Sequence, residues 1–149
     1  MEGGTDEIEA FRAIGALLDA AHLVRPHDLA ELVATACARL GAGATRLWLA
    51  DHGLRTLALL DDGEEQRLPI DGSLAGRAFT TRTVVESPGD PASPTIWYPL
   101  IDGVDRLGGL EVEDDALTDV LRNELRDVAT ISAAELVTRG RYTDAFTVT

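Results

Sequence analysis

The residues best suited to chemistry in this sequence are one cysteine and three histidines, and their spacing gives them no catalytic or metal-binding setting. Cys37 belongs to a stripe of apolar residues at helical spacing, which predicts a place in the core. A single cysteine has no partner for an internal disulfide and supplies too few thiolates for a cysteine-based zinc site. His22, His27 and His52 lack the i, i+4 spacing of paired metal ligands. The sequence therefore predicts no metal site and no bound cofactor.

The carboxylates and serines fit structural roles better than catalytic ones. Acidic residues cluster at 61–65 and 113–115, where turn and helix-cap chemistry accounts for them. Ser73 and Ser87 have no G-x-S-x-G setting, and no histidine can be assigned as their partner. We therefore expect the chain to be non-catalytic.

Length and charge narrow the class of protein further. At 149 residues with 45% hydrophobic content, one domain with one core is expected. The formal charge of −13 disfavours nucleic acid and anionic membrane surfaces as partners, because both would be repelled. No apolar run approaches the roughly 18 residues that suggest a membrane span, and the acidic start does not resemble a secretory signal. We expect a cytoplasmic protein.

Hydrophobic periodicity predicts the elements that would position these residues. Helical spacing covers residues 7–22, and a second helix begins at Asp28, which forms a capping-box signature with Glu31. That helix stops at the glycines 41 and 43. Ser73 is expected to cap a short helix over 74–82, and a long helix covers 118–139. Strands are predicted at 44–50, 54–60, 66–70, 83–86, 96–101 and 107–112.

Three details refine the expected architecture. The first two strands are almost continuously apolar, which predicts a sheet covered on both faces. Gly108 and Gly109 lie inside the last strand, where they permit close backbone approach. Three prolines exclude regular structure from residues 87–94. The fold class is α+β, an antiparallel sheet with helices on its faces.

Four strings in order resemble the signature of a GAF domain. They are DGSLAGRAF at 71–79, TVV at 83–85, WYPL at 97–100 and LGGLEV at 107–112. The resemblance implies a profilin-like fold with a central antiparallel sheet of about five or six strands. It places the terminal helices on one face, and the short helix and loops around a pocket on the other. The residues that would line this ligand pocket are Trp48, Leu74, Arg77, Phe79, Trp97 and Tyr98. The alternative is that these rings simply fill the core.

The function implied by the resemblance is regulation. Residues 28–139 would form a GAF sensor that binds a small molecule or a partner. Residues 1–27 would form a packing helix, and the terminal helices would join two copies as a homodimer. The segment VTRGRYTDAF at 137–146 is similar to the connector that leads into the metal-dependent serine/threonine phosphatases of actinobacterial regulators. Residues 140–149 would then begin a connector to such an effector. The alternative function is a ligand-free structural dimerisation module.

Overall fold

The computed structural model describes residues 26–51, 53–60, 66–87, 95–113 and 118–147. The expected first helix at 7–22 lies outside these ranges, as do most of the proline-rich segment and the acidic clusters. His22 and His52 also lie outside them. Among the described residues, no helix is long and apolar enough to cross a membrane.

The described elements form a six-stranded antiparallel sheet with three helices, in the strand order β3-β2-β1-β6-β5-β4. This confirms the expected α+β class and the expected sheet. The bounds are α2 Pro26–Leu40, β1 Thr45–Ala50, β2 Thr56–Leu59, β3 Arg67–Pro69, α3 Leu74–Thr81, β4 Val85–Glu86, β5 Thr95–Asp102, β6 Asp105–Glu113 and α4 Asp119–Thr147.

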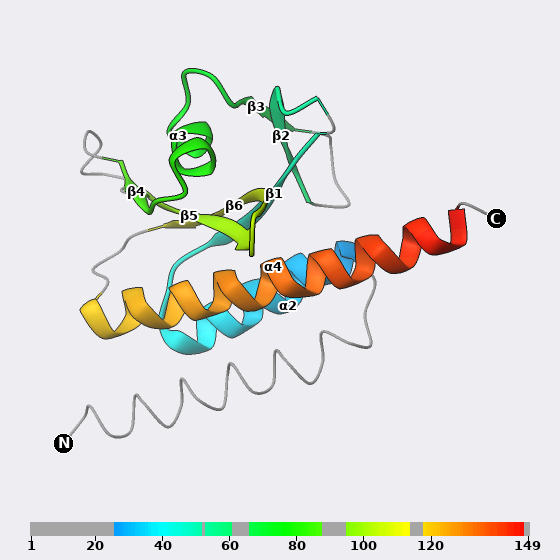
Figure 1. Cartoon of the computed structure of the whole chain (residues 1–149). Helices are drawn as coiled ribbons and strands as arrows, with labels where there is room; N and C mark the ends of the chain where they lie inside the picture. Colours follow the sequence, from blue (N-terminus) through cyan, green and yellow to red (C-terminus); the bar gives the residue numbers. More distant parts are fainter. Residues whose placement is uncertain (1–25, 52, 61–65, 88–94, 114–117, 148–149) are drawn as a thin grey trace.

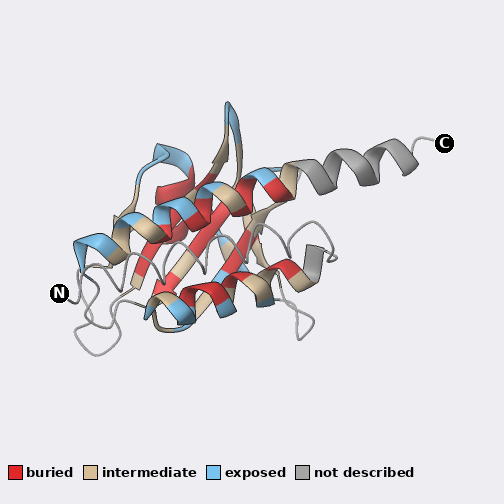
Figure 2. Ribbon diagram, turned by 90° about the horizontal axis from the view of Figure 1, so that it is seen from below, coloured by how far each residue is buried: buried red, intermediate tan, exposed pale blue. Residues whose placement is uncertain are grey.

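Three layers build the molecule, as Figure 1 shows. Helices α2 and α4 lie together on one face of the sheet, and α3 lies on the other face. The buried residues of α2 and α4 form stripes that face the strands (Figure 2). The sheet is thus covered on both faces, which explains why β1 and β2 have few polar residues.

Strand β5 separates two apolar cores because its side chains alternate between the faces of the sheet. Ile96, Tyr98 and Leu100 point to the layer of α2 and α4, where they join Leu47 and Leu110. Trp97 points the other way, into a second core under α3. Consecutive residues of one strand therefore contact two different helix layers.

Gly108 permits the central pairing of β1 with β6. It lies opposite Leu49, and a Cβ atom at this position would lie 1.8 Å from the carbonyl oxygen of Trp48. No side chain fits there without moving the strands apart. The expected close backbone approach is thus confirmed at Gly108, whereas Gly109 contacts the ring of Trp97.

The helix starts confirm one capping prediction and correct another. The Ser73 hydroxyl accepts a hydrogen bond from the Gly76 amide at 3.0 Å and caps α3, as expected. Helix α2, however, begins at Pro26, so Asp28 lies in its first turn and the predicted capping box was wrong. Proline suits the first helical position because its φ is preset and its missing N–H has no partner there.

Several element ends also differ from the sequence pattern. Strand β2 begins at Thr56, because Leu54 has a φ of 54° and stands 51% exposed in the turn. The Asp51 carboxylate holds this turn by accepting hydrogen bonds from the amides of Arg55 and Thr56. Strand β4 is only two residues long, and α4 continues past residue 139 to Thr147. The ends of these elements are set by local turn geometry and by strand pairing. Hydrophobic periodicity encodes neither of them.

Cys37 lies in the core between α2 and the sheet, as its stripe predicts. It is 0% exposed, and burial raises the pKa of its thiol from 9.0 to about 12. Desolvation disfavours the thiolate, which is the reactive form. Burial therefore disfavours the reactive form of this thiol in the folded state.

We predict that Gly108→Ala destabilises the protein by about 2–3 kcal/mol, because the new methyl group must displace the Trp48 carbonyl. Guanidinium unfolding followed by tryptophan fluorescence measures this change. Gly53→Ala is the matched control, since its Cβ would meet nothing closer than 4.0 Å. Equal stability of the two variants would contradict the assigned β1–β6 pairing.

A second prediction concerns the alkaline range. The folded-state pKa of Cys37 is raised to about 12, whereas the unfolded thiol keeps the ordinary value of 9.0. Its contribution to stability is complete below the unfolded pKa and is lost as pH rises toward the folded pKa. Between about pH 8 and pH 11, the free energy of unfolding should fall more steeply with pH in the wild type than in Cys37→Ala. Parallel pH profiles would contradict the burial of this thiol.

Candidate functional site

Three aromatic side chains meet between the sheet and α3. Trp48 comes from β1, Phe79 from α3 and Trp97 from β5, and they are 4%, 3% and 7% exposed. The two tryptophan rings lie 6.2 Å apart between centroids with their planes tilted by 53°. This spacing is typical of favourable aromatic pairs. We call Trp48, Phe79 and Trp97 the aromatic layer.

The structure brings four of the six expected pocket residues together and separates two. Leu74 is partly buried against the aromatic layer. Arg77 lies on α3 with its side chain exposed. Tyr98 points to the opposite face of the sheet, where its hydroxyl donates a hydrogen bond to the Arg122 carbonyl of α4 at 3.1 Å. The alternation of side chains along β5 accounts for Tyr98, whereas Arg77 lies on the exposed side of α3.

A carboxylate borders the aromatic layer. The Trp48 indole N–H donates to Glu111 Oε1 at 2.9 Å, and the Arg46 guanidinium lies 3.6 Å from the same oxygen. The Glu111 side chain is 16% exposed and that of Arg46 is 49% exposed. The arrangement satisfies the only polar atom of the indole ring and keeps the carboxylate partly neutralised.

A second arginine, Arg106, packs against the Phe79 ring of the aromatic layer. The Arg106 guanidinium lies 5.0 Å from the centroid of the Phe79 ring and donates to the Thr80 carbonyl at 3.3 Å. Arg82 similarly donates to the Val104 carbonyl at 3.0 Å. These contacts join the end of α3 to the β5–β6 hairpin.

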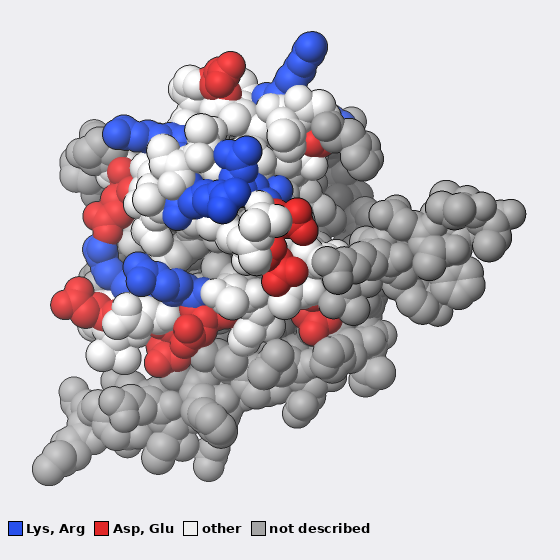
Figure 3. Space-filling view, viewed as in Figure 1, with Lys and Arg blue, Asp and Glu red and all other residues white. Residues whose placement is uncertain are grey.

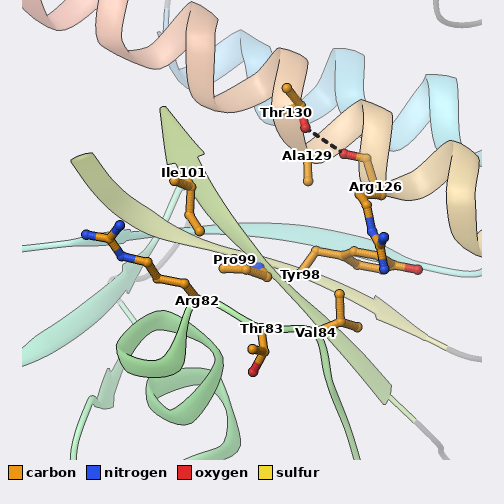
Figure 4. A pocket seen from close by; sticks show the side chains of 9 residues that line it. All are labelled: Arg82, Thr83, Val84, Tyr98, Pro99, Ile101, Arg126, Ala129 and Thr130. Atoms are coloured by element: carbon orange, nitrogen blue, oxygen red, sulfur yellow. Dashed lines mark hydrogen bonds between the residues drawn. The ribbon is translucent and has the colours of Figure 1, made fainter. Parts of the chain in front are cut away.

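All 13 basic residues of the chain are arginines. Figure 3 shows arginine side chains on the layer of α3 and also lower down, over the N-terminal part of α4, with carboxylates among them. On this face, a pocket of about 580 Å³ lies between β5, α4 and the segment that joins α3 to β4. We call it the edge pocket. Its lining residues, shown in Figure 4, are Arg82, Thr83, Val84, Tyr98, Pro99, Ile101, Arg126, Ala129 and Thr130.

The described residues hold no group of three or more histidine, cysteine or acidic side chains that could bind a metal ion.

The Asp51 carboxylate has a pKa below its usual value, because it accepts hydrogen bonds from the backbone of Arg55 and then of Thr56. Asp51 belongs to the β1–β2 turn and contacts neither the aromatic layer nor the edge pocket. Its lowered pKa therefore reflects turn structure.

Sequence reasoning missed the charged residues at both places. Glu111 is a lone carboxylate in an apolar strand, LGGLEV, and this break in the pattern is a signal that could have identified it. Arg82 and Arg126 carry no such signal. They are far apart in the sequence, and only the packing of α4 against β5 brings them to one pocket.

Comparison with known proteins supports one conclusion about the fold. No protein-family model matches the sequence, and no curated protein matches it at a significant level. The structure is similar to the GAF domain of a phosphoenolpyruvate-protein phosphotransferase from Coxiella burnetii, with a TM-score of 0.77 and 16% identity. That alignment covers 93% of this chain and 98% of the other.

Two further structures are similar to a lesser degree. The GAF domain of the potassium sensor histidine kinase from Escherichia coli has a TM-score of 0.69 and 19% identity, over 90% of this chain and 97% of its own. A free methionine-R-sulfoxide reductase from Neisseria meningitidis has a TM-score of 0.66 and 17% identity, over 89% and 91%. Identities this low establish the fold and leave function open. The chain has the GAF fold, as the four sequence strings indicate.

Proposed function

We propose that this domain is a regulatory sensor, which binds a small molecule or a partner on the α3 side and passes the change to a downstream effector through α4. The observation that carries the proposal is the pair Trp97 and Tyr98. Trp97 belongs to the aromatic layer, and the next residue is hydrogen-bonded to α4. Because the two residues share one strand, a shift of the tryptophan on one face displaces the tyrosine on the other.

A second contact supports transmission through α4. The Arg122 guanidinium pairs with the Glu86 carboxylate of β4, so the first turns of α4 are attached to the edge of the sheet. Over 29 residues α4 extends about 43 Å, and Figure 1 shows its C-terminal part continuing past the strands. Because α4 is attached to the sheet at its N-terminal end and extends past the sheet at its C-terminal end, a shift of the sheet would move the C-terminal end of α4.

The aromatic layer supports a ligand site on the α3 side. Binding pockets combine apolar and aromatic walls with a few polar groups, and Glu111 with Arg46 supplies such groups here. The rings are almost fully covered, so a ligand must displace α3 or the neighbouring segments to reach them. Such an opening would itself be the signal.

The alternative is a ligand-free dimerisation module, and the same low exposure of the aromatic layer favours it. In that case the rings serve only as core. Half-exposed Val120 at the start of α4 would then be part of the surface that joins the terminal helices of two copies. Either way we propose a cytoplasmic homodimer.

We also propose that the domain is non-catalytic and that its effector is a serine/threonine phosphatase. The buried thiol of Cys37 argues against thiol chemistry like that of an oxidised-methionine reductase. The similarity of residues 137–146 to a phosphatase connector supports the choice of effector.

For the sensor, we predict that native mass spectrometry of the purified chain will find a dimer that retains a small molecule. Both tryptophans of the chain belong to the aromatic layer, so their fluorescence reports directly on this site. Unfolding and refolding should remove the extra mass and change the emission spectrum. A dimer without extra mass, whose emission is the same before and after refolding, would favour the structural module instead.

For the effector, we predict that the full-length natural protein dephosphorylates a phosphoserine peptide. Tyr98→Phe should change its basal rate by up to about fivefold, because the lost hydrogen bond is worth about 1 kcal/mol. Thr35→Ala is the control, since it removes a hydroxyl bond on α2 away from β5.

The possible results separate the two proposals. A protein without activity on the peptide would refute the phosphatase effector and leave the sensor to be judged by mass spectrometry. Equal rates for the wild type, Tyr98→Phe and Thr35→Ala would instead refute transmission through Tyr98.

A further inference from the structure

The edge pocket exists because the pairing of β4 with β5 is short. Val85 and Glu86 pair with Trp97 and Ile96, the Ser87 amide donates to the Thr95 carbonyl, and residues 82–84 lie outside the strand. Residues 82–84 bend away from the strand and form one wall of the pocket, while α4 forms the other. A volume of about 580 Å³ lies within the range of small-molecule sites.

The pocket has an apolar floor and a polar rim. Tyr98 and Ala129 are buried at the floor, with half-buried Val84, Pro99 and Ile101 beside them. The exposed residues of the rim are Arg82, Thr83, Arg126 and Thr130. Figure 4 shows Arg82 and Arg126 at opposite ends with Pro99 between them, and Tyr98 at the Arg126 end. An occupant would thus contact apolar surface below and positive charge at the ends.

The charge of the pocket contrasts with that of the chain. Acidic residues outnumber arginines by 26 to 13, yet none of the lining residues is acidic. Arg46 and Arg122 have carboxylate partners. Among the described residues, the Arg126 guanidinium makes no ion pair or hydrogen bond, and that of Arg82 makes only the bond to the Val104 carbonyl. The pocket therefore holds positive charge that the surrounding carboxylates do not neutralise.

The backbone of Arg82 adds a second observation. Arg82 caps α3 in the left-handed conformation, with φ 58° and ψ 33°. Glycine is the usual residue there, because other residues are strained at positive φ. Non-glycine residues held in this conformation are found more often at functional sites, so Arg82 is a candidate for a binding role.

We propose that the edge pocket binds a small organic anion, with its carboxylate or phosphate group at the arginine rim and its apolar body on the floor. Arg126 supplies a planar guanidinium donor for such a group, one that pairs with no other described side chain. Two arginines are too few to hold a nucleic-acid backbone against a net charge of −13. The occupant would join α4 to the end of α3, on the face of the sheet opposite the aromatic layer, and it is a different molecule from the sensor ligand.

The test uses 1-anilinonaphthalene-8-sulfonate as a fluorescent probe, because it combines an aromatic body with an anionic group. We expect saturable binding to the folded wild type. Arg126→Gln should weaken this binding about tenfold, the effect of losing one charge-assisted hydrogen bond. Arg55→Gln removes the same charge from the exposed β1–β2 turn and should change the affinity less than twofold. N-phenyl-1-naphthylamine lacks the sulfonate and should not distinguish these three proteins.

A second variant separates binding from folding. Arg82→Gly removes the other arginine and places the residue that this φ favours, so the fold is retained. Its probe affinity should fall at least twofold while its melting temperature does not fall. Benzoate and phenyl phosphate, added separately as competitors, show whether the pocket prefers a carboxylate or a phosphate.

Amide chemical shifts locate the binding. In ¹⁵N-resolved spectra, the probe should shift the amides of residues 82–84 and 126–130 and leave those around Trp48 unchanged. Shifts confined to other surfaces, or equal probe affinity in wild type and Arg126→Gln, would overturn the proposal.

Discussion

The pairing of β1 with β6 is the contact on which the rest of this structure depends. Gly108 lies so close to the Trp48 carbonyl that no other residue fits between the two strands. This pairing holds the centre of the sheet together, with β2 and β3 added on one side and β5 and β4 on the other. It also fixes the position of Trp48 in the aromatic layer and that of Glu111 beside it. The aromatic layer therefore depends on one glycine at the centre of the sheet.

The sheet separates two different chemical environments. On the α3 side, aromatic rings pack with 3–7% exposure around one indole–carboxylate bond. On the α4 side, the short pairing of β4 leaves a pocket with an arginine rim. Tyr98 links the two, because it lines the edge pocket and follows Trp97 in the chain. An occupant of either site would act on α4 through the same strand, so the two proposed sites would influence each other.

The free-energy cost of exposing the aromatic layer differs in its consequence for a sensor and for a structural module. Buried tryptophans contribute strongly to stability, and exposing the aromatic layer costs roughly several kcal/mol of lost apolar burial. A sensor ligand must offset this cost with contacts of its own, whereas a structural module keeps the layer closed. The edge pocket requires no such opening, because its rim is exposed already. Binding there is energetically the simpler event.

The sequence by itself determined the fold class, the order of most elements and the burial of Cys37, because these follow from local periodicity, turn residues and helix caps. It also indicated the aromatic layer, since Trp48, Phe79 and Trp97 lie in elements that the four GAF-like strings place around one face. The tertiary structure decided the start of α2 at Pro26, the two-residue length of β4 and the placement of Tyr98 on the side of α4. It alone brought Arg82 and Arg126 to one pocket. Periodicity describes neighbours along the chain, whereas the edge pocket depends on how far β4 pairs with β5 and where α4 crosses them, and these are contacts between residues distant in sequence.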